Sequence, residues 1–383
     1  MGERKTNTLI VISMLALALL VIAGCSTPTG PTGEVVEEKQ ETGPVKIGFL
    51  GPLTGDISFL GNNMMKGLEM GVEEINRAGG VNGRPVKIIF EDGKCNAKEA
   101  AAAAQKLVNI DQVVAIIGGT CSSETLAAAP IAEGKTVMIS PTSSNPAITD
   151  AGDYIFRDYP SDVFQGAYAA EYAYNELGAR RVAALYCLTD WCVALNNRFK
   201  ETFEELGGEI VVEETFEQGS KDLRTQLTKI KGSDFDMIYF LSYTESGIVG
   251  LQQIKELGIT QTILGGDAWS DTTIPERAGS AADGALHPEV YTPDNPEFKA
   301  KIKAYTDSDE ITLGTPQAYD ALRILVGVMR QVGTDPEDIK DALYRVKYDG
   351  VSGKISFDEN GDLERAEYTI FEFRDGKIVE YQR

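Results

Sequence analysis

The stretch VVAIIGGTCSSETLAAAPIA, residues 113–132, decides the fold class of this chain of 383 residues. Its first six residues are apolar and rich in Val and Ile, which is typical of a strand buried on both faces. Small and polar residues follow, and residues 122–132 then favour a helix. A buried strand that leads directly into a helix is the repeating unit of a parallel sheet, so the stretch predicts an α/β protein.

The same unit recurs on both sides of this stretch. In the first half of the chain we predict strands over 45–50, 86–91, 113–118 and 136–140, and helices through 64–75, 97–110 and 122–132. The pattern restarts with helices over 163–177, 193–206, 221–230 and 246–257, between strands over 181–187, 209–216, 237–241 and 262–265. A helix over 316–332 and strands over 354–357 and 368–373 remain. The order predicts two doubly wound lobes, each a parallel sheet covered by helices on both faces.

The charge of the chain excludes two classes of partner. With 36 Lys and Arg against 58 Asp and Glu, the formal net charge is −22. Such an acidic surface repels phosphate backbones and anionic lipid headgroups. We therefore exclude nucleic acids as partners, and we exclude a basic surface that binds membranes peripherally.

The residues needed for catalysis or metal binding are scarce. The single histidine, His287, cannot form a His-rich metal site, and we expect it to be structural or at the surface. The GxSxG and HExxH motifs are absent from the sequence. Residues 134–136 resemble the end of a P-loop but lead into a predicted strand rather than a helix. We therefore predict no enzyme activity, no metal and no cofactor.

Residues 1–24 have the pattern of a secretory signal. Two basic residues precede an apolar run over 9–24, which is shorter than the roughly 20 residues that a membrane span needs. The run ends in IAGC at 22–25, which resembles a lipobox, where the chain is cut before a lipidated Cys. We predict that Cys25 carries lipid, that residues 25–44 form a flexible tether, and that the protein lies outside the cytoplasm, anchored to the membrane. An uncleaved membrane anchor is the alternative.

Four cysteines remain besides Cys25, namely Cys95, Cys121, Cys187 and Cys192. An exported protein keeps disulfides, and four cysteines allow three pairings. Cys187 and Cys192 are close enough in sequence to pair across one loop. Cys95 and Cys121 each follow a predicted strand, which can place them side by side. A four-cysteine zinc site is the alternative, although the spacing contains no CxxC pair.

Polar loops follow two of the predicted strands, and they are candidates for a binding site. In open α/β sheets, ligands bind beyond the carboxyl ends of the strands. Residues 119–125 lead into a helix that Ser122 is placed to cap, and residues 141–146 bring further hydroxyl groups beside them. Hydroxyl groups and free N–H groups at a helix N-terminus suit a carboxylate. Ordinary capping and turn formation is the alternative.

Four segments resemble the type I periplasmic binding fold and, more narrowly, the Leu/Ile/Val-binding protein family. They are FLGPLTG at 49–55, INRAGGVNG at 75–83, CSS at 121–123 and ISPTSSNP at 139–146. The resemblance covers residues 45–383 and is densest in the first half. It implies an extracytoplasmic solute-binding protein that takes a small amino acid, of branched-chain or small neutral type, to the membrane subunits of an ABC importer. We expect a monomer.

The resemblance also implies how the chain is divided. Two lobes are joined by three crossing segments, so that a ligand can bind in the cleft between them. Lobe one would contain residues 45–162 and 291–366, and lobe two would contain residues 163–290 and 367–383. Two such lobes can close around a ligand by a hinge motion.

In lobe one the resemblance assigns four contact residues and a disulfide. In the family a Ser directly after a bridged Cys contacts the ligand carboxylate, and this position falls on Ser122. The bridged pair falls on Cys95 and Cys121. The residues that follow Ile-Ser-Pro fall on Ser143 and Ser144. A first-loop position that can carry an aromatic contact falls on Leu60.

In lobe two the resemblance assigns two aromatic residues and one acid. The aromatic positions fall on Trp191 and Tyr243, and the acid that meets the ligand ammonium falls on Asp267. The best-known members have Glu where this chain has Asp267, and Tyr is usual where it has Trp191. In addition, Leu60 opens space or removes an aromatic wall, and a Cys187–Cys192 bridge would stiffen the loop around Trp191. These departures leave the side chain of the ligand open.

Two other functions fit the same fold. The first is a binder of an amide, a urea or an aromatic or aliphatic carboxylate that lacks an ammonium group. Asp267 speaks against it, because a buried acid needs a cationic partner. The second is a sensor ectodomain, for which the sequence contains no following signalling domain.

Overall fold

The computed structural model describes residues 43–306 and 311–382. The predicted signal peptide at 1–24, the lipidation site Cys25 and all but the last two residues of the predicted tether at 25–44 lie outside the described residues. None of the described helices combines the length and the apolar character that a bilayer crossing requires.

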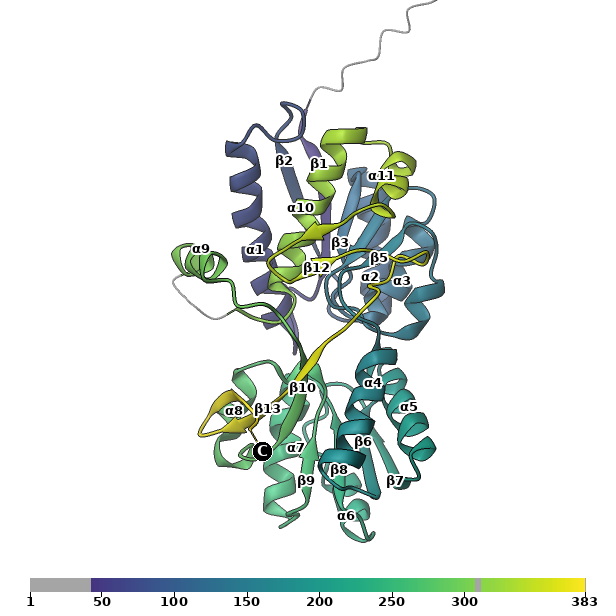
Figure 1. The fold of residues 1–383 in the computed structure, drawn as a ribbon, viewed down its shortest axis with the longest axis vertical. Helices are drawn as coiled ribbons and strands as arrows, with labels where there is room; N and C mark the ends of the chain where they lie inside the picture. The colour runs from purple at the N-terminus through teal and green to yellow at the C-terminus, as the bar shows by residue number, and fades with distance from the viewer. Residues whose placement is uncertain (1–42, 307–310, 383) are drawn as a thin grey trace, which may run out of the picture. The chain divides into compact units, whose positions relative to one another are not determined.

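The first lobe is built on a parallel sheet, which in the described residues has five strands in the order β2-β1-β3-β4-β5. Alternate side chains of each strand point to opposite faces. Val45, Ile47 and Phe49 pack with α1 and α10 on one face, whereas Leu50 packs with α2 and α3 on the other (Figure 1). The strands are β1 (Val45–Gly51), β2 (Val86–Asp92), β3 (Ala115–Gly118), β4 (Val137–Ser140) and β5 (Ile155–Arg157).

The helices of the first lobe come from two parts of the chain. From the N-terminal part come α1 (Ser58–Arg77), α2 (Ala97–Gln105), which continues as a π-helix over Lys106–Asp111, α3 (Ser122–Ala132) and a 3-10 turn at Pro146–Asp150. From the later part come α9 (Pro296–Thr306), α10 (Thr315–Val332), α11 (Pro336–Leu343) and the short strands β11 (Tyr348–Asp349) and β12 (Lys354–Ile355). The packing of α10 against α1 joins the two parts.

The second lobe is built on a mixed sheet, which in the described residues has the order β14-β13-β10-β9-β8-β6-β7. Its parallel strands are β6 (Arg181–Cys187), β7 (Glu209–Phe216), β8 (Met237–Leu241), β9 (Thr262–Leu264) and β10 (Leu286–Val290). The strands β13 (Tyr368–Arg374) and β14 (Lys377–Glu380) add an antiparallel hairpin at the edge.

The helices of the second lobe alternate with its strands along the chain. They are α4 (Asp162–Glu171), which continues as a π-helix over Tyr172–Glu176, α5 (Asp190–Glu205), α6 (Arg224–Lys231), α7 (Thr244–Glu256), α8 (Thr273–Ala278) and the 3-10 turns Asp267–Trp269 and Gly279–Ala281. Aromatic side chains fill the core here, with Phe199 stacked on Tyr239 at 3.9 Å between ring centroids. The predicted α/β fold with two lobes is confirmed, and the residue bounds of the lobes stay a prediction.

His287 is structural and not at the surface. It lies in β10 and is fully buried against Phe371 and Phe373, and its Nε2 lies 2.9 Å from Oε1 of Glu289. Of the two positions that the sequence left open, structural or at the surface, the structural one is therefore confirmed.

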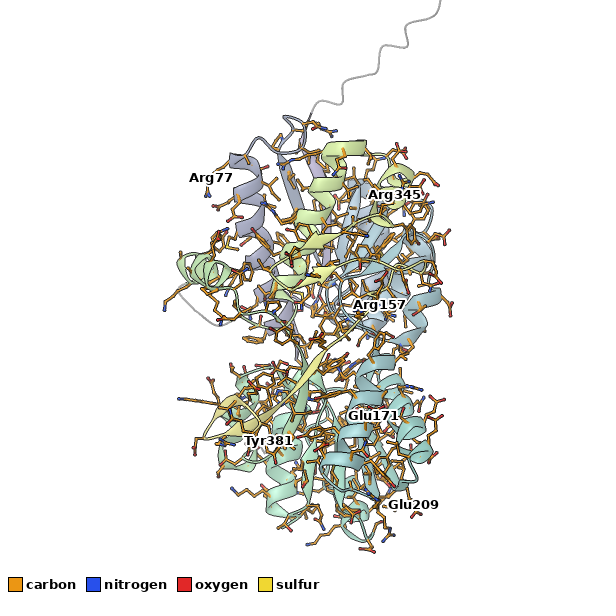
Figure 2. The ribbon with its side chains drawn as sticks, viewed as in Figure 1. Arg77, Arg157, Glu171, Glu209, Arg345 and Tyr381 are labelled. Carbon is orange, nitrogen blue, oxygen red and sulfur yellow. A yellow bond between two sulfur atoms is a disulfide. The ribbon has the colours of Figure 1, made fainter. Side chains whose placement is uncertain are left out.

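Within the described residues, the chain passes between the two sheets after β5, after β10 and before β13. The fully buried Arg157, labelled in Figure 2, connects the first passage to the third. Its guanidinium forms a bidentate ion pair with Asp362, with Nε–Oδ1 at 2.5 Å and Nη2–Oδ2 at 2.6 Å. The second and third passages lie side by side as β10 and β13, and the N–H of Tyr291 donates to the carbonyl of Glu367 at 2.8 Å. The loops at the carboxyl ends of β3, β4, β6, β8 and β9 are thereby held near one another.

Candidate functional site

One small cavity is lined by residues of both lobes, and it contains six of the seven predicted contact residues. The lining consists of Leu60, Thr120, Cys121, Ser122, Thr142, Ser144, Trp191, Tyr243, Asp267, Ala268 and Leu313. The free space between these side chains is about 30 Å³, which holds about two water molecules. An amino acid is larger than this space.

The first wall begins at the N-terminus of α3. Ser122 is buried, and its Oγ accepts a hydrogen bond from the N–H of Asn145 at 3.2 Å. Its own O–H can therefore donate into the cavity. The prediction that Ser122 caps the helix is wrong, because Cys121 occupies the capping position and Ser122 is the first helical residue.

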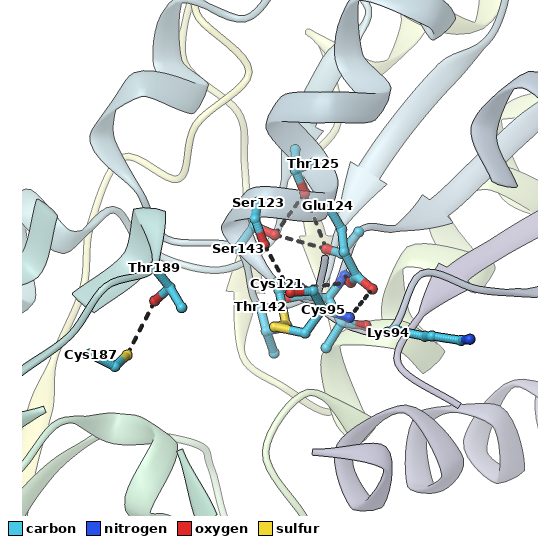
Figure 3. Close-up of a disulfide and its surroundings, with 12 residues drawn as sticks. Lys94, Cys95, Cys121, Ser123, Glu124, Thr125, Thr142, Ser143, Cys187 and Thr189 are labelled. Carbon is cyan, nitrogen blue, oxygen red and sulfur yellow. Dashed lines mark hydrogen bonds between the residues drawn. A yellow bond between two sulfur atoms is a disulfide. The ribbon is translucent and has the colours of Figure 1, made fainter. Parts of the chain in front are cut away.

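Glu124 holds the backbone of this wall in place through hydrogen bonds (Figure 3). Its carboxylate accepts hydrogen bonds from the backbone N–H groups of Thr120 and Cys121, both at 3.0 Å, and of Cys95, at 2.9 Å. Burial raises the pKa of Glu124 to about 7, although the three backbone donors act in the opposite direction. A single side chain thus holds the loops after β2 and β3 together.

The same two loops are also joined covalently. Cys95 and Cys121 form a disulfide with a Cα–Cα distance of 5.3 Å and a sequence separation of 26. Cys187 and Cys192 form another, with a sequence separation of 5. All four cysteines of the described chain are therefore in disulfides, which excludes the alternative of a four-cysteine zinc site. In the described residues, no group of three or more His, Cys, Asp or Glu side chains is placed to hold a metal ion.

The two serines after β4 have different roles. Ser144 lines the cavity and is buried. Ser143 does not line it, because its O–H donates to the carbonyl of Gly119 at 2.8 Å and its Oγ lies 2.7 Å from the Oγ1 of Thr125. Ser143 therefore joins the loops after β3 and β4, whereas Ser144 faces the cavity.

The second wall is aromatic and is fixed by the other disulfide. Trp191 lies in the first turn of α5, since the helix begins at Asp190 and not at the predicted residue 193. The Thr189 side chain caps this helix by accepting from the N–H of Cys192, at 3.3 Å. The Trp191 ring lies 5.1 Å from the ring of Tyr243, and both side chains are buried. Because Trp191 is enclosed between Cys187 and Cys192, its backbone is held close to the end of β6.

The acidic end of the cavity is Asp267, which begins the 3-10 turn after β9 and is buried. Its Oδ2 accepts a hydrogen bond from the hydroxyl of Tyr159 at 2.6 Å. Burial raises the pKa of Asp267, and the Tyr159 hydroxyl and the side chain of Gln165 lower it in part. No cationic side chain lines the cavity among the described residues, so the acid has no charged partner of its own.

Five lining residues were not predicted as contacts, and one of them, Cys121, was predicted only as part of a disulfide. Thr120 and Thr142 belong to the two strand-end loops that the sequence had singled out, and the Oγ1–H of Thr142 donates to the carbonyl of Thr120 at 2.7 Å. Ala268 directly follows the predicted Asp267. Leu313 comes from the loop before α10, far away in sequence, where no motif marks it.

Comparison with known proteins agrees with this geometry. Residues 44–377 match the model of the family described as periplasmic binding protein. A Pseudomonas aeruginosa protein named leucine-, isoleucine-, valine-, threonine- and alanine-binding protein is 32% identical over 337 residues, which are 86% of this chain and 90% of that protein.

Two solved structures are similar as well. A leucine-binding protein from Thermotoga maritima has a TM-score of 0.82 and 32% identity, and the match covers 88% of this chain and 98% of that one. A solute-binding protein from R. palustris, solved with 4-hydroxybenzoate, has a TM-score of 0.79, 23% identity and coverage of 89% and 96%. The second likeness concerns the fold alone.

Proposed function

We propose, from the premise that this chain belongs to the periplasmic binding protein family, that it captures a small neutral amino acid between its lobes for an ABC importer. The observation that carries the proposal is one enclosure with hydroxyl groups on one wall and a buried acid without a charged partner on the other. A ligand that offers a carboxylate to the first wall and an ammonium to the second satisfies both. An α-amino acid has these two groups on adjacent atoms of one small molecule.

Each part of the ligand has a counterpart. We assign the carboxylate to the hydroxyls of Ser122 and Ser144 and to the N-terminus of α3, where N–H groups lack partners within the helix. The ammonium goes to Asp267 as a charge-assisted hydrogen bond.

The side chain of the ligand lies against Leu60, Leu313, Trp191 and Tyr243. This largely apolar surface favours an aliphatic side chain. The names of the Pseudomonas aeruginosa and Thermotoga maritima proteins support branched-chain or small neutral amino acids. The shorter acid and the absent aromatic wall at Leu60 affect which of them binds most tightly.

A second candidate is an aromatic carboxylate. The Trp191–Tyr243 ring pair, which can stack on a flat ligand, favours it. Such a ligand would leave Asp267 buried without a cation, which is costly. The amino acid is therefore the better fit.

Thermal denaturation with each of the twenty amino acids, with amides and with benzoates tests the proposal. A ligand that binds only the folded state raises the melting temperature. We expect the largest rise with a branched-chain or small neutral amino acid, and compaction in small-angle scattering as the lobes close around it. A rise with benzoates alone would replace the first candidate by the second.

We also propose that the protein acts outside the cytoplasm, held to the membrane by lipid on Cys25. The pattern at residues 1–25 supports this, and the family is named for a periplasmic location. The intact mass of the protein isolated from its native membrane tests this proposal. We expect a chain that begins at a lipidated Cys25, and a chain that retains residues 1–24 would contradict the assignment.

A further inference from the structure

A second acid lies directly behind the cavity wall. Asp162 is the first residue of α4 and is fully buried. Its backbone N–H donates to the carbonyl of Ser144, a lining residue, at 2.7 Å. In the described part of the chain neither carboxylate oxygen of Asp162 has a hydrogen-bond partner of normal geometry, although the side chains of Ser144 and Trp191 are close enough to stabilise its ionised form.

The surroundings of Asp162 contain another acid and several phenols but little positive charge. Burial and the charge of Asp267 both raise the pKa of Asp162. The guanidinium of Arg157 acts in the opposite direction, but it is already paired with Asp362. Six titratable or charged groups face Asp162. They are Asp267 from the turn after β9, Tyr159 and Arg157 from the first passage, Tyr239 from β8, Tyr243 from the start of α7 and Tyr368 from β13. Glu289 acts on Asp267 and Glu124 acts on Tyr243 from further away.

Two contacts bring the two acids close together. The N–H of Asp162 donates to Ser144, which lines the cavity with Asp267, and Tyr159, in the passage just before Asp162, donates to Asp267. Two buried carboxylates that lie close together repel each other, and each loses its hydration. We propose that Asp162 and Asp267 form an acid pair that holds one proton while the cavity is empty and releases it when the ammonium of a ligand enters. The carboxyl O–H bond breaks, its electron pair stays on the oxygen, and the proton passes to a base in the solvent. The two acids titrate as a unit, so the proton belongs to the pair and not to either residue.

Asp162 is a positioning residue in this arrangement, since it acts through Asp267, Ser144 and Trp191 and does not line the cavity. The consequence of the acid pair is that the site distinguishes ligands by their charge. A ligand with an ammonium replaces the proton by a cation, whereas a ligand with a carboxylate alone leaves the pair as it was. The effect on ligands rests on the proposed function, but the shared proton of the empty cavity does not.

The same passage contains a matched control. Asp158 is also buried, and its two carboxylate oxygens also lack hydrogen-bond partners among the described residues. The acid that faces it is Asp320, which does not line the cavity. Asp158→Asn therefore removes an equally buried acid without touching the proposed pair.

Infrared spectroscopy of the ligand-free full chain at neutral pH tests the shared proton directly, because a protonated carboxyl absorbs where an ionised one does not. We expect one protonated-carboxyl band that is present in the wild type and in Asp158→Asn and is lost in Asp162→Asn. A spectrum of Asp162→Asn with every such band retained would overturn the pair, whichever ligand the protein binds.

Calorimetry with L-leucine, in two buffers of different ionisation enthalpy and over a pH series, tests the release. Below the pKa of the pair we expect the wild type to release close to one proton per leucine, and its Kd to fall about tenfold per pH unit. Asp162→Asn should release none and show a flat profile, and Asp158→Asn should behave as the wild type. Equal proton release in Asp162→Asn and the wild type would overturn the inference.

A leucine analogue without the ammonium separates the two proposals. If 4-methylpentanoate binds, it should do so without proton release. If neither L-leucine nor any other amino acid binds the wild type, the proposed function fails, and the infrared comparison still decides whether the acid pair exists.

Discussion

The two walls of the cavity consist of different kinds of side chain and are fixed by different kinds of contact. The first-lobe wall consists largely of hydroxyl groups at strand ends, and a buried Glu124 fixes it through three backbone N–H groups. The second-lobe wall consists of two aromatic rings and an acid, and a disulfide across five residues fixes it. In the proposed function each lobe recognises a different end of the ligand, so neither lobe alone offers a complete site. A ligand that contacts both walls therefore favours the closed arrangement.

Substituting Asp267 should have the largest effect on binding. Asp267→Asn keeps an acceptor for the Tyr159 hydroxyl but loses the charge that meets the ammonium. We expect a loss of about 2–4 kcal/mol in binding, which is roughly 30- to 1000-fold in Kd, with little change in melting temperature. Calorimetry with the best ligand from the denaturation screen measures it.

Asp271→Asn is the control for this substitution. Asp271 is buried in the same loop but binds Thr244 and the N–H of Thr273 and does not line the cavity. Its Kd should stay near that of the wild type. An Asp267→Asn variant that binds within threefold of the wild type would show that the acid is structural.

The support behind the first wall should depend on pH. The pKa of Glu124 is raised from 4.5 to about 7, which corresponds to about 3 kcal/mol. A carboxyl with a raised pKa in the folded state contributes stability that is fully present below pH 4.5 and is lost as the pH rises through 7. Urea unfolding over this range should show a steeper fall for the wild type than for Glu124→Gln. Equal slopes would contradict the assignment.

Removing the disulfides should separate stability from binding. In the chain-entropy model the bridge across 26 residues contributes about 3 kcal/mol, and the bridge across 5 residues about 2 kcal/mol. We expect the double Ser variant of Cys95 and Cys121 to lose more unfolding free energy. We expect the double Ser variant of Cys187 and Cys192 to lose more affinity, because Trp191 lies inside its loop. Denaturant titration and calorimetry on both variants test this, and unchanged affinity in the second would refute the role given to its bridge.

The smallest effects concern two serines of the first wall. Ser122→Ala removes a hydroxyl assigned to the ligand carboxylate, so we expect about 2 kcal/mol less binding free energy. Ser143→Ala removes hydrogen bonds to Gly119 and Thr125, so we expect about 1 kcal/mol less stability and an almost unchanged Kd. A larger loss of affinity in Ser143→Ala than in Ser122→Ala would reverse these assignments.

The sequence predicted the longer strands better than the shortest ones. Strands 181–187, 209–216 and 237–241 have the predicted bounds, because turn-forming or polar residues delimit each of them. The strand β5 was not predicted, since three residues give no periodic signal, and it is recognisable only from its pairing with β4. The start of α5 was misplaced because Thr189 caps the helix four residues before its predicted start at residue 193.

The site could be predicted only in part, and mostly through the family resemblance. The sequence by itself indicated the two hydroxyl-rich loops, which the structure places together, but it could not distinguish Ser143 from Ser144. Adjacent residues in a turn point in different directions, and only the tertiary contacts of Gly119 and Thr125 decide which one faces the cavity. Asp162 was not predicted because its role depends on Asp267, which lies more than a hundred residues away in the chain.

The arrangement of the crossing segments limits how the lobes can separate. The strands β10 and β13 enter the second lobe as hydrogen-bonded neighbours, so they bend together as one ribbon. The passage after β5 is a separate segment, and the Arg157–Asp362 ion pair holds its start against the segment that leads into β13. Two pivots define one line, so we expect the opening to have a single degree of freedom, a rotation about that line without swivel. The mouth of the cleft would then widen much more than the rim near the pivots, and ligands would enter and leave by one route.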